Sequence, residues 1–78
     1  MEPVEVTVRF NGRGELLPLN FTWQGVTYPV DSTGRRWLDD KGQHILVMVP
    51  GERVFELLFV TSEMRWYLDR IRTGQSFA

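Results

Sequence analysis

The sequence predicts a small all-β domain, an antiparallel barrel or roll of five to six strands. Three observations favour this class. Short segments alternate apolar and polar residues with the period of two that is typical of half-buried strands. Turn-forming residues separate these segments at short intervals, and no strands alternate with helices. With 78 residues the chain has room for one domain, which we expect to span residues 1–72, followed by a flexible tail over residues 73–78.

Composition narrows the class of protein further. Hydrophobic residues make up 42% of the chain and cysteine is missing, so a core must form without disulfides or thiolate metal ligands. The net charge of −1 lacks the basic excess that is typical of nucleic-acid-binding domains. The N-terminal stretch MEPVEVTV predicts no secretory signal, and the longest apolar run, residues 45–50, is far short of the ~20 residues that cross a bilayer. We therefore expect a cytoplasmic protein with no membrane partner and no cofactor.

The first expected strand covers residues 3–10. There, Val4, Val6, Val8 and Phe10 alternate with polar residues, so one face is apolar and the other is polar. The turn-rich sequence NGRG follows at residues 11–14, where two glycines allow a tight change of direction. The alternation then resumes, which predicts that the next strand runs back along the first.

The stretch FTWQGVTYPV, residues 21–30, predicts a tight hairpin with Gln24-Gly25 as its loop. In this register the apolar pairs are Leu19 with Val30, Phe21 with Tyr28, and Trp23 with Val26. The polar pairs on the other face are Asn20 with Pro29 and Thr22 with Thr27. A slip of one residue would mix the two sets, so the register is well specified. These aromatic residues are therefore interpreted as core.

The second half of the chain predicts further strands. Residues 31–34 (DSTG) are expected to form a loop and residues 36–38 a short strand, with a turn at residues 39–42. Residues 45–49 and 53–60 are expected to pair across a loop at Pro50-Gly51-Glu52. That register places Val47 opposite Phe55 and Ile45 opposite Leu57, which gives these strands a common apolar face.

Residues 62–72 fit two structures. After a tight turn at Ser62-Glu63 they form a strand in which Trp66 opposes Phe59 and Leu68 opposes Leu57. Alternatively, Ser62 caps a short C-terminal helix whose apolar face begins at Met64. The strand is favoured because it places Trp66 in the core, whereas the helix would leave that side chain outside.

One block of the sequence carries a family resemblance. Pro18, Phe21, Trp23, Gly25, Tyr28 and Val30 follow the pattern P-x-x-F-x-W-x-G-x-x-Y-x-V, with Arg36-Trp37 and Trp66-Tyr67-Leu68 further on. Over residues 18–71 the chain resembles a family of short bacterial domains of unknown function. The resemblance implies a β-barrel-like module with no assigned activity or catalytic residue, some of whose relatives lie near translesion DNA polymerase genes. Those relatives are richer in arginine in the first hairpin, where this chain has Asn20, Thr22 and Gln24.

Catalytic residues are not predicted. The only histidine, His44, begins a strand on the face opposite Ile45, and we interpret it as a surface residue. Asp39 and Asp40 are adjacent in a turn sequence, so we interpret them as solvated turn residues. The sequence therefore predicts no catalytic site, no metal site and no enzymatic activity.

The last strands are apolar on both faces. If Ile45, Val47, Phe55, Leu57, Phe59, Trp66 and Leu68 face the core, the opposite face carries Leu46, Met48, Val54, Leu58, Val60 and Tyr67. A half-buried sheet should have polar residues there, and a contiguous apolar patch usually marks an interface. We therefore hypothesise an interaction module that binds itself or a protein partner through this face. The alternative is that residues 36–38, the first strand or a terminal helix covers it.

A second hypothesis is binding of single-stranded nucleic acid. Cations lie next to aromatic residues in two clusters, and such pairs can bind phosphates and stack on bases. Asp39, Asp40 and Asp69 lie nearby and reduce the local positive field, which makes this the less favoured hypothesis. The candidate residues are Arg35, Arg36, Trp37, Arg65, Arg70 and Arg72.

Overall fold

The computed structural model describes residues 1–73 and has seven antiparallel strands and no helix over that range. The strands are β1 (Glu2–Phe10), β2 (Leu16–Trp23), β3 (Val26–Pro29), β4 (Ser32–Leu38), β5 (Gln43–Val49), β6 (Arg53–Val60) and β7 (Arg65–Thr73). The all-β class is confirmed, but the predicted number of five to six strands is too low. No helix in this range is long and apolar enough to cross a membrane. Apart from Thr73, which ends β7, the predicted tail lies outside the described residues.

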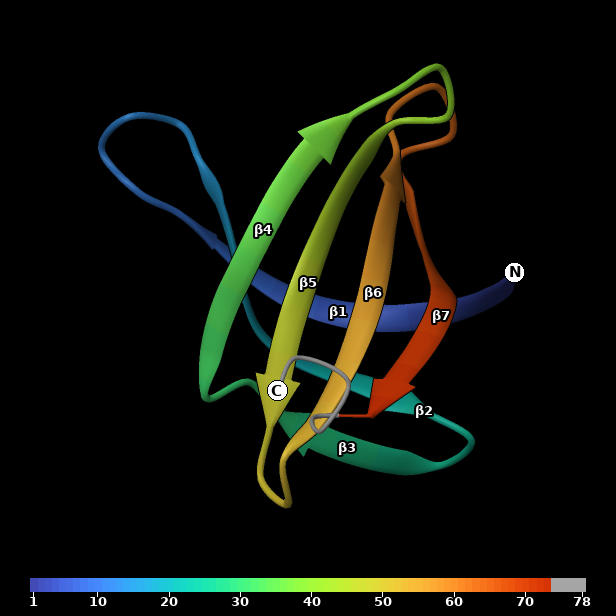
Figure 1. The fold of residues 1–78 in the computed structure, drawn as a ribbon. Coiled ribbons are helices and arrows are strands. Elements are labelled where there is room, and N and C mark those ends of the chain that lie inside the picture. Colours follow the sequence, from blue (N-terminus) through green and yellow to red (C-terminus); the bar gives the residue numbers. More distant parts are fainter. Residues whose placement is uncertain (74–78) are drawn as a thin grey trace.

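The strands form one sheet in the order β3-β2-β1-β7-β6-β5-β4. The sheet curls strongly, so that β4–β7 run side by side at the front while β1–β3 cross behind them (Figure 1). β1 joins the two parts because it pairs with β2 over most of its length and with β7 only through Glu2, Pro3 and Val4. This half-barrel creates an inner face, between the two groups of strands, and an outer face of β4–β7 that points away from β1–β3.

The two edges of the sheet meet because β3 and β4 are joined by only two residues. The backbone N–H of Val30 donates to Leu19 at 3.0 Å, and that of Asp31 donates to Met48 at 2.7 Å, so the link is bonded to both groups of strands. Arg36 on β4 donates to the carbonyl oxygen of Leu16 on β2 at 2.6 Å. These bonds hold the curled sheet together along the line where its edges approach.

The predicted hairpin registers are confirmed. Phe21 pairs with Tyr28 across the β2–β3 turn, where Gln24 and Gly25 have φ angles of 51° and 77°. Positive φ at both loop residues matches the right-handed twist of the flanking strands, which explains why a glycine occupies the second position. Val47 pairs with Phe55, and Trp66 pairs with Phe59. Residues 62–72 are thus a turn followed by a strand, and the helical alternative is wrong.

One predicted loop is wrong. Residues 31–34 were expected to be irregular, but β4 begins at Ser32 and pairs with β5 on both sides of an irregularity between Thr33 and Arg36. A bulge of this kind adds a residue to one strand without ending the ladder. Gly34 sits in it beside Leu46 and Met48, close enough that a Cβ would be in van der Waals contact with both side chains. Gly34 therefore lies in a bulge where β4 comes close to the side chains of β5, although the composition of residues 31–34 suggested a loop.

The core lies on the inner face. Its fully buried side chains come mainly from β5 and β6, with Phe21 from β2 and Leu68 from β7. Phe55 is central, since its ring lies 5.0 Å from Phe21, 5.3 Å from Tyr28 and 5.9 Å from Trp23. The sequence stretch at residues 21–30 is therefore one wall of the aromatic core, as predicted.

Candidate functional site on the outer face

Four directly paired residues cross the outer face of β4–β7. Trp37 pairs with His44, His44 with Leu58, and Leu58 with Tyr67, so their side chains share this face. Leu58 on β6 has no exposed surface, although no described strand lies in front of β6 in Figure 1. The bulky neighbours on either side, His44 and Tyr67, account for that burial. The outer face is therefore packed laterally, and is not an open apolar patch.

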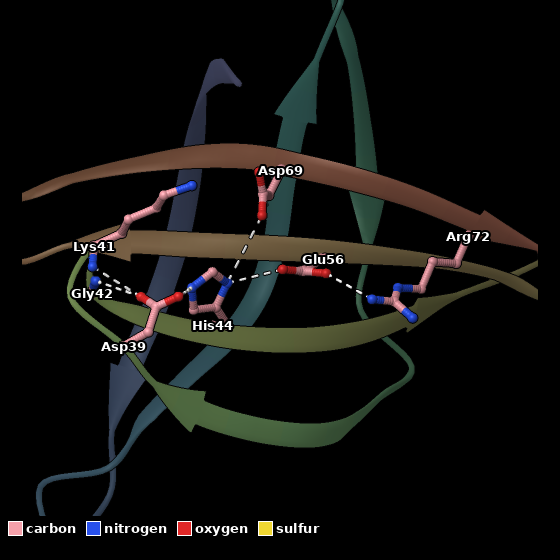
Figure 2. Close-up of polar contacts among 7 residues, drawn as sticks. All are labelled: Asp39, Lys41, Gly42, His44, Glu56, Asp69 and Arg72. Atoms are coloured by element: carbon pink, nitrogen blue, oxygen red, sulfur yellow. Dashed lines mark hydrogen bonds and ion pairs between the residues drawn. The ribbon is translucent and has the colours of Figure 1, made fainter.

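A buried polar network occupies the centre of this face. His44 is 3% exposed, and its Nδ1 atom lies 2.9 Å from Oε2 of Glu56, which is also 3% exposed. Its Nε2 atom lies 2.8 Å from Oδ2 of Asp39. The Nδ1 atom is also 3.9 Å from Oδ2 of Asp69. Figure 2 shows these contacts running across the strands from Asp39 to Arg72.

The turn between β4 and β5 positions Asp39. Its Oδ1 atom accepts hydrogen bonds from the backbone N–H groups of Lys41 (2.9 Å) and Gly42 (3.2 Å). Gly42 has φ of 152° and packs so tightly that a Cβ would lie 2.1 Å from the carbonyl oxygen of Phe59. Loss of solvation raises the pKa of Asp39, but these N–H bonds and His44 outweigh that effect and lower it. Asp39 is thus held as a carboxylate against the imidazole.

Glu56 is held as a carboxylate from two sides. Burial by itself raises its pKa, but the hydrogen bonds from Arg72 and His44 outweigh burial and lower the pKa below its ordinary value. Arg72 donates from one guanidinium NH₂ group to Oε1 of Glu56 at 3.0 Å. One Glu56 oxygen therefore contacts Arg72 and the other contacts His44.

Asp69 reaches the network because of a second bulge. Glu56 pairs with Arg70 and the next residue, Leu57, pairs with Leu68, so Asp69 is the extra residue of β7. Bulges re-aim side chains and are frequent beside functional sites. Here the bulge places an additional carboxylate next to Glu56, with a side chain that is 19% exposed. Asp69 is the part of the network nearest to solvent after the more exposed Asp39 and Arg72.

An aromatic stack supports the histidine. The rings of Trp37 and His44 are parallel within 4°, with centroids 4.9 Å apart. The guanidinium group of Arg35 lies over the Trp37 ring at 5.0 Å. The stack restrains the plane of the imidazole, while Asp39 restrains its rotation. His44 is consequently oriented by contacts on its face and on one of its nitrogen atoms.

The predicted partner-binding residues do share the outer face, but they differ in exposure. Val54, Leu58 and Val60 are 5%, 0% and 9% exposed. Leu46, Met48 and Tyr67 are half-buried, and the Tyr67 hydroxyl donates to Glu63. Only these last three residues can contribute directly to a contact surface.

Most of the predicted nucleic-acid residues share the outer face, and only Arg36, which pairs with the core residue Ile45, does not, but several of them are already engaged by protein groups. Arg36 is bonded to Leu16, Arg72 is bonded to Glu56, and Arg35 lies over Trp37. Because Trp37 already contacts His44 and Arg35, a nucleic-acid base would have to displace one of them to stack on its ring. Arg65 and Arg70 are exposed on β7. The arrangement favours structural roles for most of these cations.

Sequence reasoning misplaced His44 and overlooked its partners. The assignment of His44 to the surface is wrong because flanking side chains bury it, whereas the face on which it lies was predicted correctly. Asp39 and Asp40 are exposed turn residues as expected, but Asp39 also binds His44. Glu56 was not considered. The signal that could have revealed it is a single charge inside the apolar segment VFELLFV, two residues from the position opposite His44.

The sequence matches no family model, and neither a curated protein nor a solved structure shows significant similarity to it. The resemblance described above therefore stays a prediction. Function has to be argued from the geometry of the outer face.

Proposed function

We propose that this domain is a non-enzymatic interaction module that binds a second copy of itself through the outer face of β4–β7. The observation that carries the proposal is the composition of this face. Half-exposed Leu46, Met48 and Tyr67 surround a buried charge network on a sheet face that no described strand covers. Tyr, Met and Arg are enriched at protein interfaces, and this face presents all three together with few fully apolar positions exposed, which is a composition that suits contact with another chain.

The distribution of charge favours a second copy as the occupant. The outer face carries acidic Asp39 and Asp69 as well as basic Arg35 and Arg70. In a dimer with two-fold symmetry the same patch meets itself, so a patch with both signs of charge can pair opposite charges. The net charge of −1 also imposes little repulsion between copies.

Molar mass by light scattering tests the proposal. We expect the mass to rise from the 9.1 kDa of one chain toward twice that value as concentration increases from about 10 μM to about 1 mM, the range that reveals weak dimers. Leu46→Asp and Met48→Asp should return the protein to a monomer, because each would place a charge in the contact. Leu58→Asp is unsuitable because that side chain has no exposed surface.

Val26→Asp is the matched control. Val26 is 50% exposed on β3, away from the outer face, so this variant should dimerise like the wild type. Circular dichroism should show that all three variants are folded. A wild-type protein that remains at 9.1 kDa at every concentration would overturn self-association. Equal loss of the dimer in all three variants would show that the contact lies elsewhere.

A further inference from the structure

We propose that His44, Glu56 and Asp69 form a binding site for a divalent transition-metal ion such as Zn²⁺. This inference does not depend on dimerisation, because all three residues belong to one chain. One ligand atom from each side chain lies within 4.8 Å of the other two. The Nδ1 atom of His44 is 2.9 Å from a Glu56 oxygen and 3.9 Å from an Asp69 oxygen.

These separations are close to those of donor atoms around a metal. An ion with bonds of about 2.1 Å to nitrogen and oxygen holds neighbouring donors roughly 3.0–3.4 Å apart. The two distances from Nδ1, 2.9 Å and 3.9 Å, lie on either side of that range, so the side chains would have to shift for all three donors to bind one ion. The extra residue at the β7 bulge is what brings Asp69 within reach.

The charges also favour a cation. Asp39, Glu56 and Asp69 supply three negative charges, and Arg72 supplies one positive charge. These four side chains therefore carry an excess of two negative charges, and ligand oxygens of Glu56 and Asp69 are within 4.8 Å of each other. Buried like charges at such a distance are unfavourable. A divalent ion would offset this excess.

Two of the three proposed ligands, His44 and Glu56, have outer partners that orient them. Asp39 lies 2.8 Å from Nε2 of His44, so when Nε2–H donates to this carboxylate the Nδ1 atom can serve as the ligand beside Glu56 and Asp69. Arg72 holds the second oxygen of Glu56, and Trp37 restrains the imidazole plane. A carboxylate on the far nitrogen of a histidine is the usual support for a metal ligand. In the metal-bound form the ion takes the place of the proton shared by Nδ1 and Glu56.

The donor set indicates the class of ion. One nitrogen and two carboxylate oxygens suit Zn²⁺ and its neighbours in the first transition row, whereas Mg²⁺ and Ca²⁺ prefer oxygen ligands alone. Three protein ligands leave at least one coordination position for water. Asp69, with 19% of its side chain exposed, marks the side from which solvent and ion can enter.

Titration of chelator-treated protein with Zn²⁺ or Co²⁺ tests this site. Calorimetry should give one ion per chain, and Co²⁺ should develop visible absorption when nitrogen and oxygen donors replace its water. His44 is the only histidine, so the ¹⁵N chemical shift of its Nδ1 atom reports directly on whether this nitrogen binds Zn²⁺. We expect that shift to change while Nε2 keeps its proton.

Asp69→Asn and Asp40→Asn form a matched pair. Asp40 is an exposed turn residue near the site but outside it, so its variant should bind Zn²⁺ like the wild type. Asp39→Asn should weaken binding by about 10–100-fold, the usual effect of losing an outer partner. Asp69→Asn should weaken binding more than this, because it removes a ligand. Asp69 is partly exposed, and circular dichroism should confirm that its variant folds.

Two results would overturn the site. One is the failure of wild-type protein to bind Zn²⁺ or Co²⁺ at about 1 mM, the weak limit of specific binding. The other is equal affinity of the Asp69→Asn and Asp40→Asn variants, which would place any bound ion elsewhere on the chain. In either case the network would be a set of ion pairs only.

Discussion

The two faces of β5 and β6 bury their central side chains by different chemistry. On the inner face, Phe55 and Leu57 are fully buried within the apolar core, whereas on the outer face His44 and Glu56 are 3% exposed and hydrogen-bonded. Burial of each apolar side chain contributes about 1.5–3 kcal/mol to stability. Burial of an ion pair contributes little, because desolvation offsets the attraction. The apolar core therefore accounts for most of the stability, and the buried charges of the outer face are what the two proposals above would explain.

The largest loss of stability should come from creating a cavity in the core on the inner face. Phe55→Ala removes the ring that contacts Phe21, Trp23 and Tyr28, and should lower the free energy of unfolding by about 3–5 kcal/mol. Urea unfolding followed by tryptophan fluorescence measures this. Phe10→Ala is the control, because Phe10 is 65% exposed and its loss should change stability by about 0.5 kcal/mol or less. Similar losses in both variants would contradict the assignment of Phe55 to the centre of the core.

The next largest loss of stability should come from removing one partner of the polar network on the outer face. Glu56→Leu leaves the buried His44 without one of its two carboxylate partners and should cost about 2–3 kcal/mol. Arg72 can still reach water, since 36% of its side chain is exposed, which limits the loss. Urea unfolding at pH 7 provides the measurement. A variant as stable as the wild type would mean that the hydrogen bonds of Glu56 contribute nothing to the free energy of unfolding.

A fall in pH should weaken the interactions of the outer face before those of the inner face. Glu56 and Asp39 have pKa values below their ordinary values of 4.5 and 3.8 in the folded state. The unfolded chain therefore binds more protons as the pH falls, so the stability they contribute is present above pH 5 and is lost below it. Urea unfolding between about pH 6 and pH 3 should show this decline, with a smaller slope in Glu56→Gln. An unchanged slope would show that Glu56 does not carry the effect.

The smallest loss of stability should come from replacing Arg35 at the edge of the outer face. Arg35→Gln removes a cation from above Trp37 at an exposed position, and should cost no more than about 0.5–1 kcal/mol. Its measurement is again urea unfolding, with Arg13→Gln in the exposed first turn as the control. A loss of several kcal/mol would mean that Arg35 holds the stack and the network in place.

The sequence predicted the fold best where alternation was strict. The β2–β3 and β5–β6 registers followed because a slip of one residue would have moved Phe21 or Phe55 to the wrong face. The start of β4 was missed because Ser32, Thr33 and Gly34 have the composition of a loop, and a bulge cannot be recognised from alternation. Pairing with β5 outweighed the loop-like composition of these residues.

The candidate site was harder to predict because it depends on neighbours across strands. Alternation assigns His44 to a face, but its burial depends on the side chains beside it on the neighbouring strands, Trp37 and Leu58. Asp69 joins the site only through a bulge in β7, which shifts the register by one residue. The sequence analysis assigned the apolar residues of the outer face to the same face correctly. The charged residues among them form the polar network, and these determine what the face can bind.

The most direct test of the difference between the faces is to replace the central ion pair with apolar side chains of similar size. His44→Phe with Glu56→Leu keeps a ring stacked on Trp37 and fills the same space. If the network serves binding, the double variant should be at least as stable as the wild type in urea, and should recover the loss seen in Glu56→Leu alone. Stability lower than that of the single variant would contradict the account, because it would show that the buried charges hold the fold together.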